Sequence, residues 1–285
     1  MEKTQNEKSG KTQKWNFSIH EKQKAIKYYN KNGFVGFYDL LTSKDLKQIQ
    51  NAVDEAVKNK KLGYADDSIY PNQDIIYAHP VLEEYVKDPR ICNIVRDLTG
   101  APIELQHAKL NAKPLHSRTN GGIKWHQDYP FYPHTNFDLV ACGIHLDDED
   151  EGAGPLRYIP GSHKHGLKSH CKNGIFAKEF TGNEDLEKMP SELITCSAGQ
   201  VMFHHSLTLH NSAPKVHDGQ RRLIVFQYRA QDAVQLSGLV WNCTGYQVTP
   251  KEVHGLARFP DGTVVENRGW DGKLIDLFNR FKPMY

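Results

Sequence analysis

The residues with the clearest chemical potential are a histidine and a carboxylate two positions apart, His126 and Asp128. Alternate residues of an extended chain point to the same side, so both side chains can reach one metal ion. His210 offers a third ligand from a distant part of the sequence. Two histidines and one carboxylate on one face of a metal leave other positions open, which is typical of iron(II) oxygenases. We therefore predict a metal site, although a histidine–x–aspartate tripeptide alone is more often a solvated turn.

Two arginines, Arg221 and Arg222, follow His210 at the start of an apolar run. A guanidinium can bind a carboxylate through two parallel hydrogen bonds, so an arginine near the metal would suit a carboxylate-bearing cosubstrate such as 2-oxoglutarate. Strand alternation directs only one of the two arginines inward, and the pattern does not say which. The alternative is that both lie on the surface, where arginines are usually found.

Before these segments the sequence is mainly helical in pattern. The clearest amphipathic helix covers residues 43–61, with Ser43 as its N-cap and apolar residues at helical spacing. Gly100 is a natural end for the last helix. We also predict helices over residues 20–32, 81–86 and 91–98, and a short strand over 34–38.

Beyond Pro102 the chain consists of short runs rich in branched and aromatic residues, separated by Gly, Pro, Asn and Asp. Such runs predict strands, so the fold class is mainly β with flanking helices (α+β). Residues 1–16 are polar and are predicted to form a flexible tail. We expect residues 17–285 to form a single domain with its β core from about residue 103. The predicted strands cover residues 103–113, 139–146, 156–159, 201–209 and 223–229.

Composition narrows the cellular setting. The chain carries 36 basic and 34 acidic residues, so its charge gives no reason to expect nucleic acid or an anionic membrane as partner. No apolar stretch approaches the roughly 18 to 20 residues of a membrane span. Its five cysteines include no C-x-x-C pair, which fits reduced thiols. We expect a cytoplasmic monomer or homodimer that acts on a small molecule.

Three linked segments resemble the phytanoyl-CoA dioxygenase family of Fe(II)- and 2-oxoglutarate-dependent oxygenases. They are WHQDYPFYPHTNFD, GPLRYIPGSHKHG, and HNSAP followed by RRLIVFQYRA, within a likeness that covers roughly residues 20–230. The resemblance implies a double-stranded β-helix, a jelly-roll or cupin-like barrel with helices outside it. It also implies Fe(II), 2-oxoglutarate and O₂, and the hydroxylation of an unactivated C–H bond with release of succinate and CO₂.

The resemblance also implies roles for single residues. His126, Asp128 and His210 match the iron ligands of the family. The residue that binds the distal carboxylate of 2-oxoglutarate usually lies eleven places after the distal histidine, which selects Arg221, and the hydroxyl two places after that histidine is Ser212. Because related halogenases lack the carboxylate ligand, Asp128 favours hydroxylation. Further candidates for the cosubstrate pocket are Asn111 and Lys109.

The substrate is harder to infer. Aromatic and polar residues after the triad segment could form the wall of its pocket, but such residues are equally common in a barrel core. The stretch FYPHTN followed by an aspartate resembles family members that act on small polar molecules, including aminophosphonates. The candidate pocket residues are Trp125, Tyr129, Phe131, Tyr132, His134 and Arg157.

Two other functions remain compatible with the residues. A zinc hydrolase could use the same triad with a bound water, although Arg221 and Ser212 would then lack a task. A barrel that binds a small molecule without catalysis is the second alternative. His204 and His205 are predicted to be a strand pair, one facing the core and one the loops, and not further ligands. Residues from 235 onward could close the barrel or form an oligomer contact.

Overall fold

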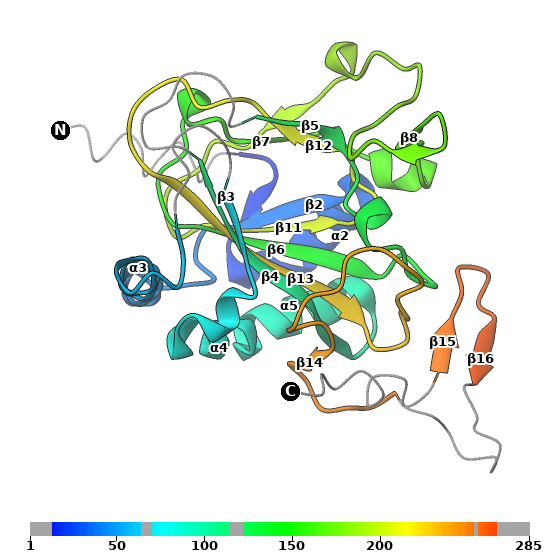
Figure 1. Ribbon diagram of the computed structural model, residues 1–285, viewed down its shortest axis with the longest axis horizontal. Helices are drawn as coiled ribbons and strands as arrows, with labels where there is room; N and C mark the ends of the chain where they lie inside the picture. Colours follow the sequence, from blue (N-terminus) through cyan, green and yellow to red (C-terminus); the bar gives the residue numbers. More distant parts are fainter. Residues whose placement is uncertain (1–12, 64–69, 114–121, 254–255, 267–285) are drawn as a thin grey trace.

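The computed structural model describes residues 13–63, 70–113, 122–253 and 256–266. Two main sheets face each other, and helices lie against the outer side of the larger sheet (Figure 1). The mainly β fold with flanking helices is therefore confirmed. Within the described ranges no strand pairing joins the two sheets, so they do not close into a barrel.

The larger sheet runs in the order β1-β2-β11-β6-β13-β4-β14, with β3 also paired to β4. Its central pairs, β11 with β6 and β13 with both β6 and β4, are antiparallel. The strands are β1 (Asn16–Phe17), β2 (Phe34–Phe37), β3 (Tyr70–Gln73), β4 (Ile103–Lys113), β6 (Leu139–His145), β11 (Val201–His205), β13 (Arg221–Ala230) and β14 (Tyr246–Gln247).

The smaller sheet runs in the order β10-β7-β12-β5 and is antiparallel throughout. It consists of β5 (Ile123–His126), β7 (Leu156–Tyr158), β10 (Glu192–Leu193) and β12 (His210–Ser212). Two separate hairpins complete the strands. They are β8 (Cys171–Lys172) with β9 (Ile175–Phe176), and β15 (Leu256–Arg258) with β16 (Val264–Glu266).

The helices lie close to their predicted positions. They are α2 (Lys22–Asn32), α3 (Ser43–Lys58), α4 (Pro80–Val86) and α5 (Pro89–Thr99). As predicted, α5 ends at Gly100, which adopts the left-handed conformation that glycine tolerates best. Short 3-10 turns are η1 (Ile19–Glu21), η2 (Ile75–Tyr77), η3 (Tyr129–Phe131), η4 (Glu151–Ala153), η5 (Ser162–His165) and η6 (Leu186–Lys188).

The predicted N-cap of α3 is wrong by one residue. Thr42, not Ser43, caps the helix: its side chain accepts a hydrogen bond from the Asp45 backbone, and the Asp45 carboxylate accepts one from the Thr42 backbone. This reciprocal capping box requires a partner three residues after the cap. Asp45 stands at that distance from Thr42, which decides where the helix begins.

Strand alternation divides the core into two layers. On β13, Ile224 and Phe226 face the helices and belong to the large cluster that also contains Ile49 of α3. Leu223 and Val225 point the other way and pack between the two sheets. Fully burying an apolar side chain of this size contributes about 1.5–3 kcal/mol, so both layers hold the sheets in register. The site described below lies in the layer between the sheets.

The predicted boundary of the N-terminal tail is too late in the chain. Trp15 is completely buried, and its carbonyl accepts a hydrogen bond from the Gly36 backbone. Asn16 and Phe17 form β1, parallel to β2. The indole of Trp15 supplies enough apolar surface to hold this segment, so residues 15 and 16 belong to the fold. The polar, glycine-bearing sequence HSRTNGG of residues 116–122, which predicts a loop before β5, lies outside the described residues except for Gly122.

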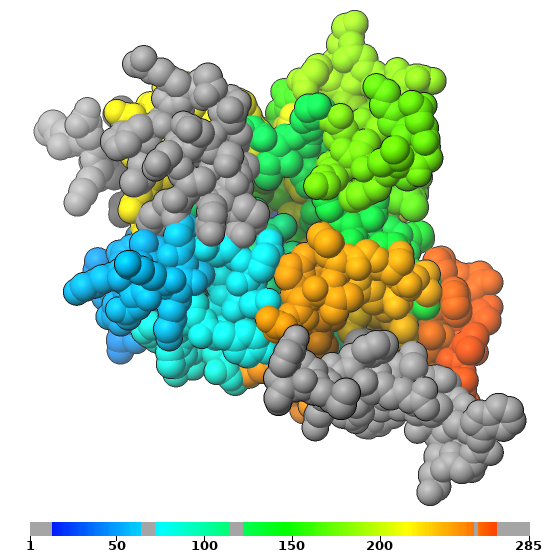
Figure 2. Space-filling view, viewed as in Figure 1, coloured from blue at the N-terminus to red at the C-terminus, as the bar shows by residue number. Residues whose placement is uncertain are grey.

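Residues 235–248 cover one end of the larger sheet. The backbone N–H groups of Leu236 and Leu239 donate to Pro133 and Phe131, and that of Gly245 donates to Leu105 on β4. In Figure 2 this segment is the orange surface between the cyan helical region and the green residues above it. None of the helices in the described ranges is long and apolar enough to cross a membrane.

Candidate functional site

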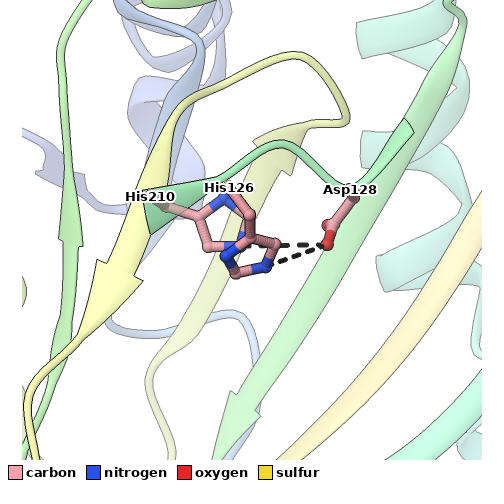
Figure 3. A group of neighbouring side chains, drawn as sticks. All are labelled: His126, Asp128 and His210. Atoms are coloured by element: carbon pink, nitrogen blue, oxygen red, sulfur yellow. Dashed lines mark ion pairs between the residues drawn. The ribbon is translucent and has the colours of Figure 1, made fainter. Parts of the chain in front are cut away.

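The predicted triad comes together between the sheets (Figure 3). His126 and His210 are register partners on the antiparallel strands β5 and β12, and their ring centroids lie 4.1 Å apart. Asp128 follows β5 directly, and its Oδ1 lies 3.7 Å from Nε2 of His126 and 3.8 Å from Nε2 of His210. All three residues are buried, and one ligand atom from each lies within 4.8 Å of the others.

Both histidines are oriented by their own strands. His126 Nδ1 lies 2.8 Å from the Lys124 carbonyl oxygen, and His210 Nδ1 lies 2.9 Å from that of Thr208. A carbonyl oxygen only accepts, so each Nδ1 carries the proton and each Nε2 is left with a lone pair toward the centre of the triad. This backbone support of the second ring nitrogen is usual for metal-binding histidines.

The electrostatics suit a cation. Burial alone would raise the pKa of Asp128, but the three histidines around the carboxylate, His210, His126 and His204, outweigh it and hold that pKa well below its usual range. Burial, with the neighbouring His126, lowers the pKa of His210 well below its usual value. An ionised carboxylate and a neutral imidazole are the protonation states that bind a divalent metal.

The two arginines of β13 face opposite ways. Arg221 is buried between the sheets, and its Nε lies 3.1 Å from Oε1 of Glu149, which also accepts a hydrogen bond from His145 Nδ1 at 2.7 Å. Arg222 turns to the other face and forms an ion pair of 2.7 Å with Asp147. Arg221, the residue implied by the resemblance, is therefore the one on the side of the triad.

Buried polar atoms near Arg221 lack partners. Among the described residues, neither Nη2 of Arg221 nor Oγ of Ser212 has a hydrogen-bond partner. Lys113 links the two, because it is the register partner of Arg221 and its ammonium donates to the carbonyl of Ala213, next to Ser212. A buried donor without a partner costs about 1–3 kcal/mol, and a carboxylate would satisfy both atoms. These residues thus fit the distal carboxylate of 2-oxoglutarate.

Lys113 itself was not singled out in the sequence. Burial and the nearby charge of Arg221 lower its pKa to about 7. Its ammonium also donates to the Gly154 carbonyl at 2.7 Å. Lys113 follows Lys109 and Asn111 at the spacing of one strand face, which was the available signal.

Lys109 and Asn111 face the same cavity as the triad. Both project from β4 toward the smaller sheet, at the level of Val225 and Leu223 on β13. Burial lowers the pKa of Lys109, while the charge of Asp128 opposes that effect. The side-chain ammonium of Lys109 has no hydrogen bond or ion pair with another described residue. The structure therefore places an unpaired amine beside the metal site.

The aromatic candidates divide into two groups. The ring of Phe131 lies edge-on to His126 with centroids 5.8 Å apart, and Tyr132 donates to Gln227 at 3.2 Å. Tyr129 instead donates to the backbone of His134, whose ring lies 3.1 Å from the Gln106 side chain. Phe131 is therefore beside the triad, whereas Tyr129 and His134 form hydrogen bonds with residues outside the triad.

Trp125 and Arg157 do not line the metal cavity. Strand alternation turns Trp125 away from His126, and its indole donates to Glu187 at 2.7 Å. Arg157 stacks on the indole, with 4.7 Å between its guanidinium carbon and the ring centroid, and also pairs with Glu187. Both lie on the outer face of the smaller sheet, and their place in a substrate pocket stays a prediction.

Three residues near the triad were not predicted to take part in the site. His204 contacts Asp128, and the ring of His107 packs against Trp241 with centroids 4.3 Å apart. The positions of His107 on β4 and His204 on β11 could have indicated that each shares a face with other polar residues of its strand. The partner strands, which decide what each face meets, could not be read from the local pattern.

Comparison with known proteins agrees with this geometry. The family model described as phytanoyl-CoA dioxygenase (PhyH) matches residues 29–223. A probable alpha-ketoglutarate-dependent hypophosphite dioxygenase of Stutzerimonas stutzeri is 35% identical over 162 residues, which cover 55% of this chain and 56% of that protein. Peroxisomal phytanoyl-CoA dioxygenase of Homo sapiens is 26% identical over 255 residues, 81% of this chain and 74% of that one.

The fold is also found in solved structures. The crystal structure of EctD from S. alaskensis with 2-oxoglutarate and 5-hydroxyectoine is similar with a TM-score of 0.63 and 17% identity, covering 82% of this chain and 84% of that one. The family match spans most of the chain and includes the whole triad. The chain belongs to the phytanoyl-CoA dioxygenase family, and it is an iron- and 2-oxoglutarate-dependent oxygenase.

Proposed function

We propose that this oxygenase hydroxylates a C–H bond of a small anionic molecule. In the overall reaction O₂ supplies one oxygen atom to the C–H bond and one to 2-oxoglutarate, which becomes succinate and CO₂. The two electrons from 2-oxoglutarate and the two from the substrate together reduce O₂, so no other reductant is needed. The bound iron supplies the activation of O₂.

The chain's own residues hold the reactants. In this proposal His126, Asp128 and His210 bind the iron, and Arg221 with Ser212 binds the distal carboxylate of 2-oxoglutarate. The facing sheets form a double-stranded β-helix of the jelly-roll type within a single domain. The depth of the site between them keeps bulk water away from the reacting bond.

The proposal of an anionic substrate rests on Lys109. Its side chain shares a cavity with the triad and has no ionic partner among the described residues. A half-buried amine without a partner is unfavourable, and an anion placed beside it would remove that cost. Lys109 precedes Lys113, the neighbour of Arg221, by four positions, or about 13 Å along the strand. That distance exceeds the length of a five-carbon diacid anchored at Arg221, so Lys109 remains available to a second anion.

The comparison with the hypophosphite dioxygenase supports the same substrate class. Its name identifies a small phosphorus oxyanion as the substrate of that protein. The present chain could act on an organic relative of such an anion, for example an aminophosphonate, since phosphonates combine an anionic head with C–H bonds.

Turnover of a substrate panel tests this proposal. The purified protein is supplied with Fe(II), 2-oxoglutarate and O₂, and succinate is measured with phosphonates, hypophosphite, small carboxylates and matched neutral amides or alcohols. We expect substrate-dependent succinate only with anions. Stimulation by the neutral compounds alone would contradict an anionic substrate, and succinate formation without any need for Fe(II) would contradict the metal chemistry.

The substitution Lys109→Met then tests the residue. It keeps the length of the side chain and removes its charge, so we expect the KM of the anionic substrate to rise about 10- to 100-fold, the equivalent of one charge-assisted hydrogen bond. The Kd of 2-oxoglutarate should change little. If the loss falls on 2-oxoglutarate binding instead, Lys109 serves the cosubstrate. Lys24→Met, which removes a charge from the exposed surface of α2, is the control.

A further inference from the structure

His204 contacts the carboxylate of the triad, and its ring lies beside that of His210 with centroids 4.7 Å apart. Its Nε2 lies 2.9 Å from Oδ2 of Asp128. The other carboxylate oxygen, Oδ1, is the one nearest to His126 and His210. The two oxygens of Asp128 therefore have different surroundings: one faces the metal site, and the other is already bonded to the protein.

The direction of these hydrogen bonds follows from their partners. An ionised carboxylate only accepts, so His204 Nε2 carries the proton and donates it to Asp128. The Nδ1 atom of the same ring then accepts, and the Tyr158 hydroxyl lies 2.9 Å from it as donor. A continuous chain of hydrogen bonds thus runs from Tyr158 through His204 to Asp128.

The chain of hydrogen bonds is held rigidly from both sheets. Tyr158 on β7 is fully buried, and its ring stacks on Phe34 of β2 with centroids 4.6 Å apart. His204 lies on β11, which pairs with β2 in the larger sheet. Because a side chain from each sheet contributes, the position of the Asp128 carboxylate is fixed by the way the two sheets face each other.

We infer that His204 is a positioning residue that makes Asp128 bind the iron through Oδ1 alone. A carboxylate free to rotate could bind through both oxygens and would then occupy one more coordination position. The bond to His204 engages Oδ2 and keeps that position open for 2-oxoglutarate or O₂. The inference rests on the proposed ligand set, and it adds a supporting residue that the triad pattern does not contain.

If His204 had a purely structural role, we would expect an apolar ring at this position. The neighbouring cluster between the sheets is apolar, with Ala141, Leu156 and Met202 among its members. If His204 only filled space, an apolar ring would serve at least as well, because it would bury no polar atoms. Both ring nitrogens instead have a partner, and one of them is the triad carboxylate.

Metal affinity of the metal-free protein tests the inference without substrate. Co(II) or anaerobic Fe(II) is titrated into wild type, His204→Phe and His204→Gln. Loss of such a supporting hydrogen bond typically weakens metal binding about 10- to 100-fold, and we expect that loss in His204→Phe. His204→Gln retains an N–H donor and should recover most of the affinity. The ligand-field spectrum of bound Co(II) should change in the Phe variant, as the carboxylate binding mode changes.

Two further variants separate positioning from folding. Tyr158→Phe removes a single hydroxyl and leaves the ring, so it should give a smaller loss of affinity in a folded protein even if His204→Phe does not fold. His205→Gln is the matched control, because that ring lies on the adjacent residue and accepts from the Leu207 backbone, away from Asp128. Its metal affinity should equal that of wild type.

The outcome that overturns the inference is clear. Wild-type Co(II) affinity and spectrum in both His204→Phe and Tyr158→Phe, whatever their free energy of unfolding, would show that His204 is structural. Failure of the proposed ligand set is distinguishable, since His126→Ala would then also bind Co(II) as tightly as wild type. Neither result depends on the identity of the substrate.

Discussion

Arg221 and Arg222 are adjacent in the chain and have opposite surroundings. Arg221 lies between the sheets with one unpaired nitrogen, beside Glu149. Arg222 is held by acidic residues on the other face of β13, at 2.7 Å from Asp147 and 2.8 Å from Asp54. At the scale of single residues, the direction of the side chain separates the proposed cosubstrate ligand from a structural ion pair.

The substitution Arg221→Gln should weaken 2-oxoglutarate binding. Removing the guanidinium eliminates a charge-assisted pair with the distal carboxylate, which is worth about 1.5–3 kcal/mol, or roughly 10- to 100-fold in Kd. Calorimetric titration of 2-oxoglutarate into the Fe(II)- or Co(II)-loaded protein measures the change. The substitution also leaves Glu149 without the cation that pairs with it, so the free energy of unfolding should fall as well.

Arg222→Gln is the matched control for this experiment. It removes an equally buried guanidinium from the neighbouring residue and should lower stability through loss of the ion pairs with Asp147 and Asp54. The Kd of 2-oxoglutarate should stay within about twofold of wild type. A larger effect in Arg222→Gln than in Arg221→Gln would reverse the assignment of the two residues.

At the scale of elements, a single reciprocal contact fixes where α3 begins. The Thr42 and Asp45 side chains each bond to the other's backbone. Asp45 also receives two hydrogen bonds from Arg90 of α5 and one from Tyr85 of α4. The cap therefore ties three helices together on the outer face of the larger sheet, which is the face that supports the strands of the site.

Thr42→Ala should destabilise the protein by about 1 kcal/mol, the usual cost of losing an N-cap side chain. Ser43→Ala should have little effect, because Ser43 is the first helical residue and does not cap. Urea denaturation monitored by circular dichroism measures both changes. Equal losses of stability in the two variants would mean that the capping box contributes nothing beyond helix propensity. We expect the activity of both variants to remain close to that of wild type.

The elements show what local sequence could and could not predict. Helix ends marked by Gly100, and strands marked by branched residues, were predictable because their causes lie within a few residues. The position of Trp125 was not, since which face of β5 meets the larger sheet depends on pairing with β12. The contact between His204 and Asp128 could not be predicted for the same reason, because Asp128 approaches from the other sheet. The triad itself was found because its residue types are restricted by metal chemistry.

At the scale of the whole molecule, the site lies between two sheets, and residues 235–248 cover one end of the larger sheet. Trp241 of this segment forms a cluster with His107 of β4 and with Tyr132, at centroid distances of 4.3 and 5.9 Å. A hydrogen bond from the Leu239 N–H to the Phe131 carbonyl holds the segment against the residues that follow the triad. The covering segment is therefore coupled to the wall of the site through its backbone as well as its indole.

Gly238 makes this close approach possible. Its φ is +89°, and a Cβ atom there would lie 2.3 Å from the Phe131 carbonyl oxygen. Gly238→Ala should cost at least about 1–2 kcal/mol for the left-handed backbone alone, and the clash with a backbone atom adds to it. Because the segment must move away from Phe131, we expect faster proteolysis within residues 235–248. We also expect a roughly 3- to 10-fold higher KM for the substrate, equivalent to about 1 kcal/mol of lost contact.

Gly262→Ala supplies the matched control for Gly238→Ala. Its φ is +86°, but nothing lies within 4 Å of a Cβ at that position, and it belongs to the β15–β16 hairpin away from the site. It should carry a similar backbone cost without the clash, so the substrate KM should match that of wild type. If both variants raise KM equally, the effect is general loosening of the fold; if neither does, the covering segment does not bound the substrate site.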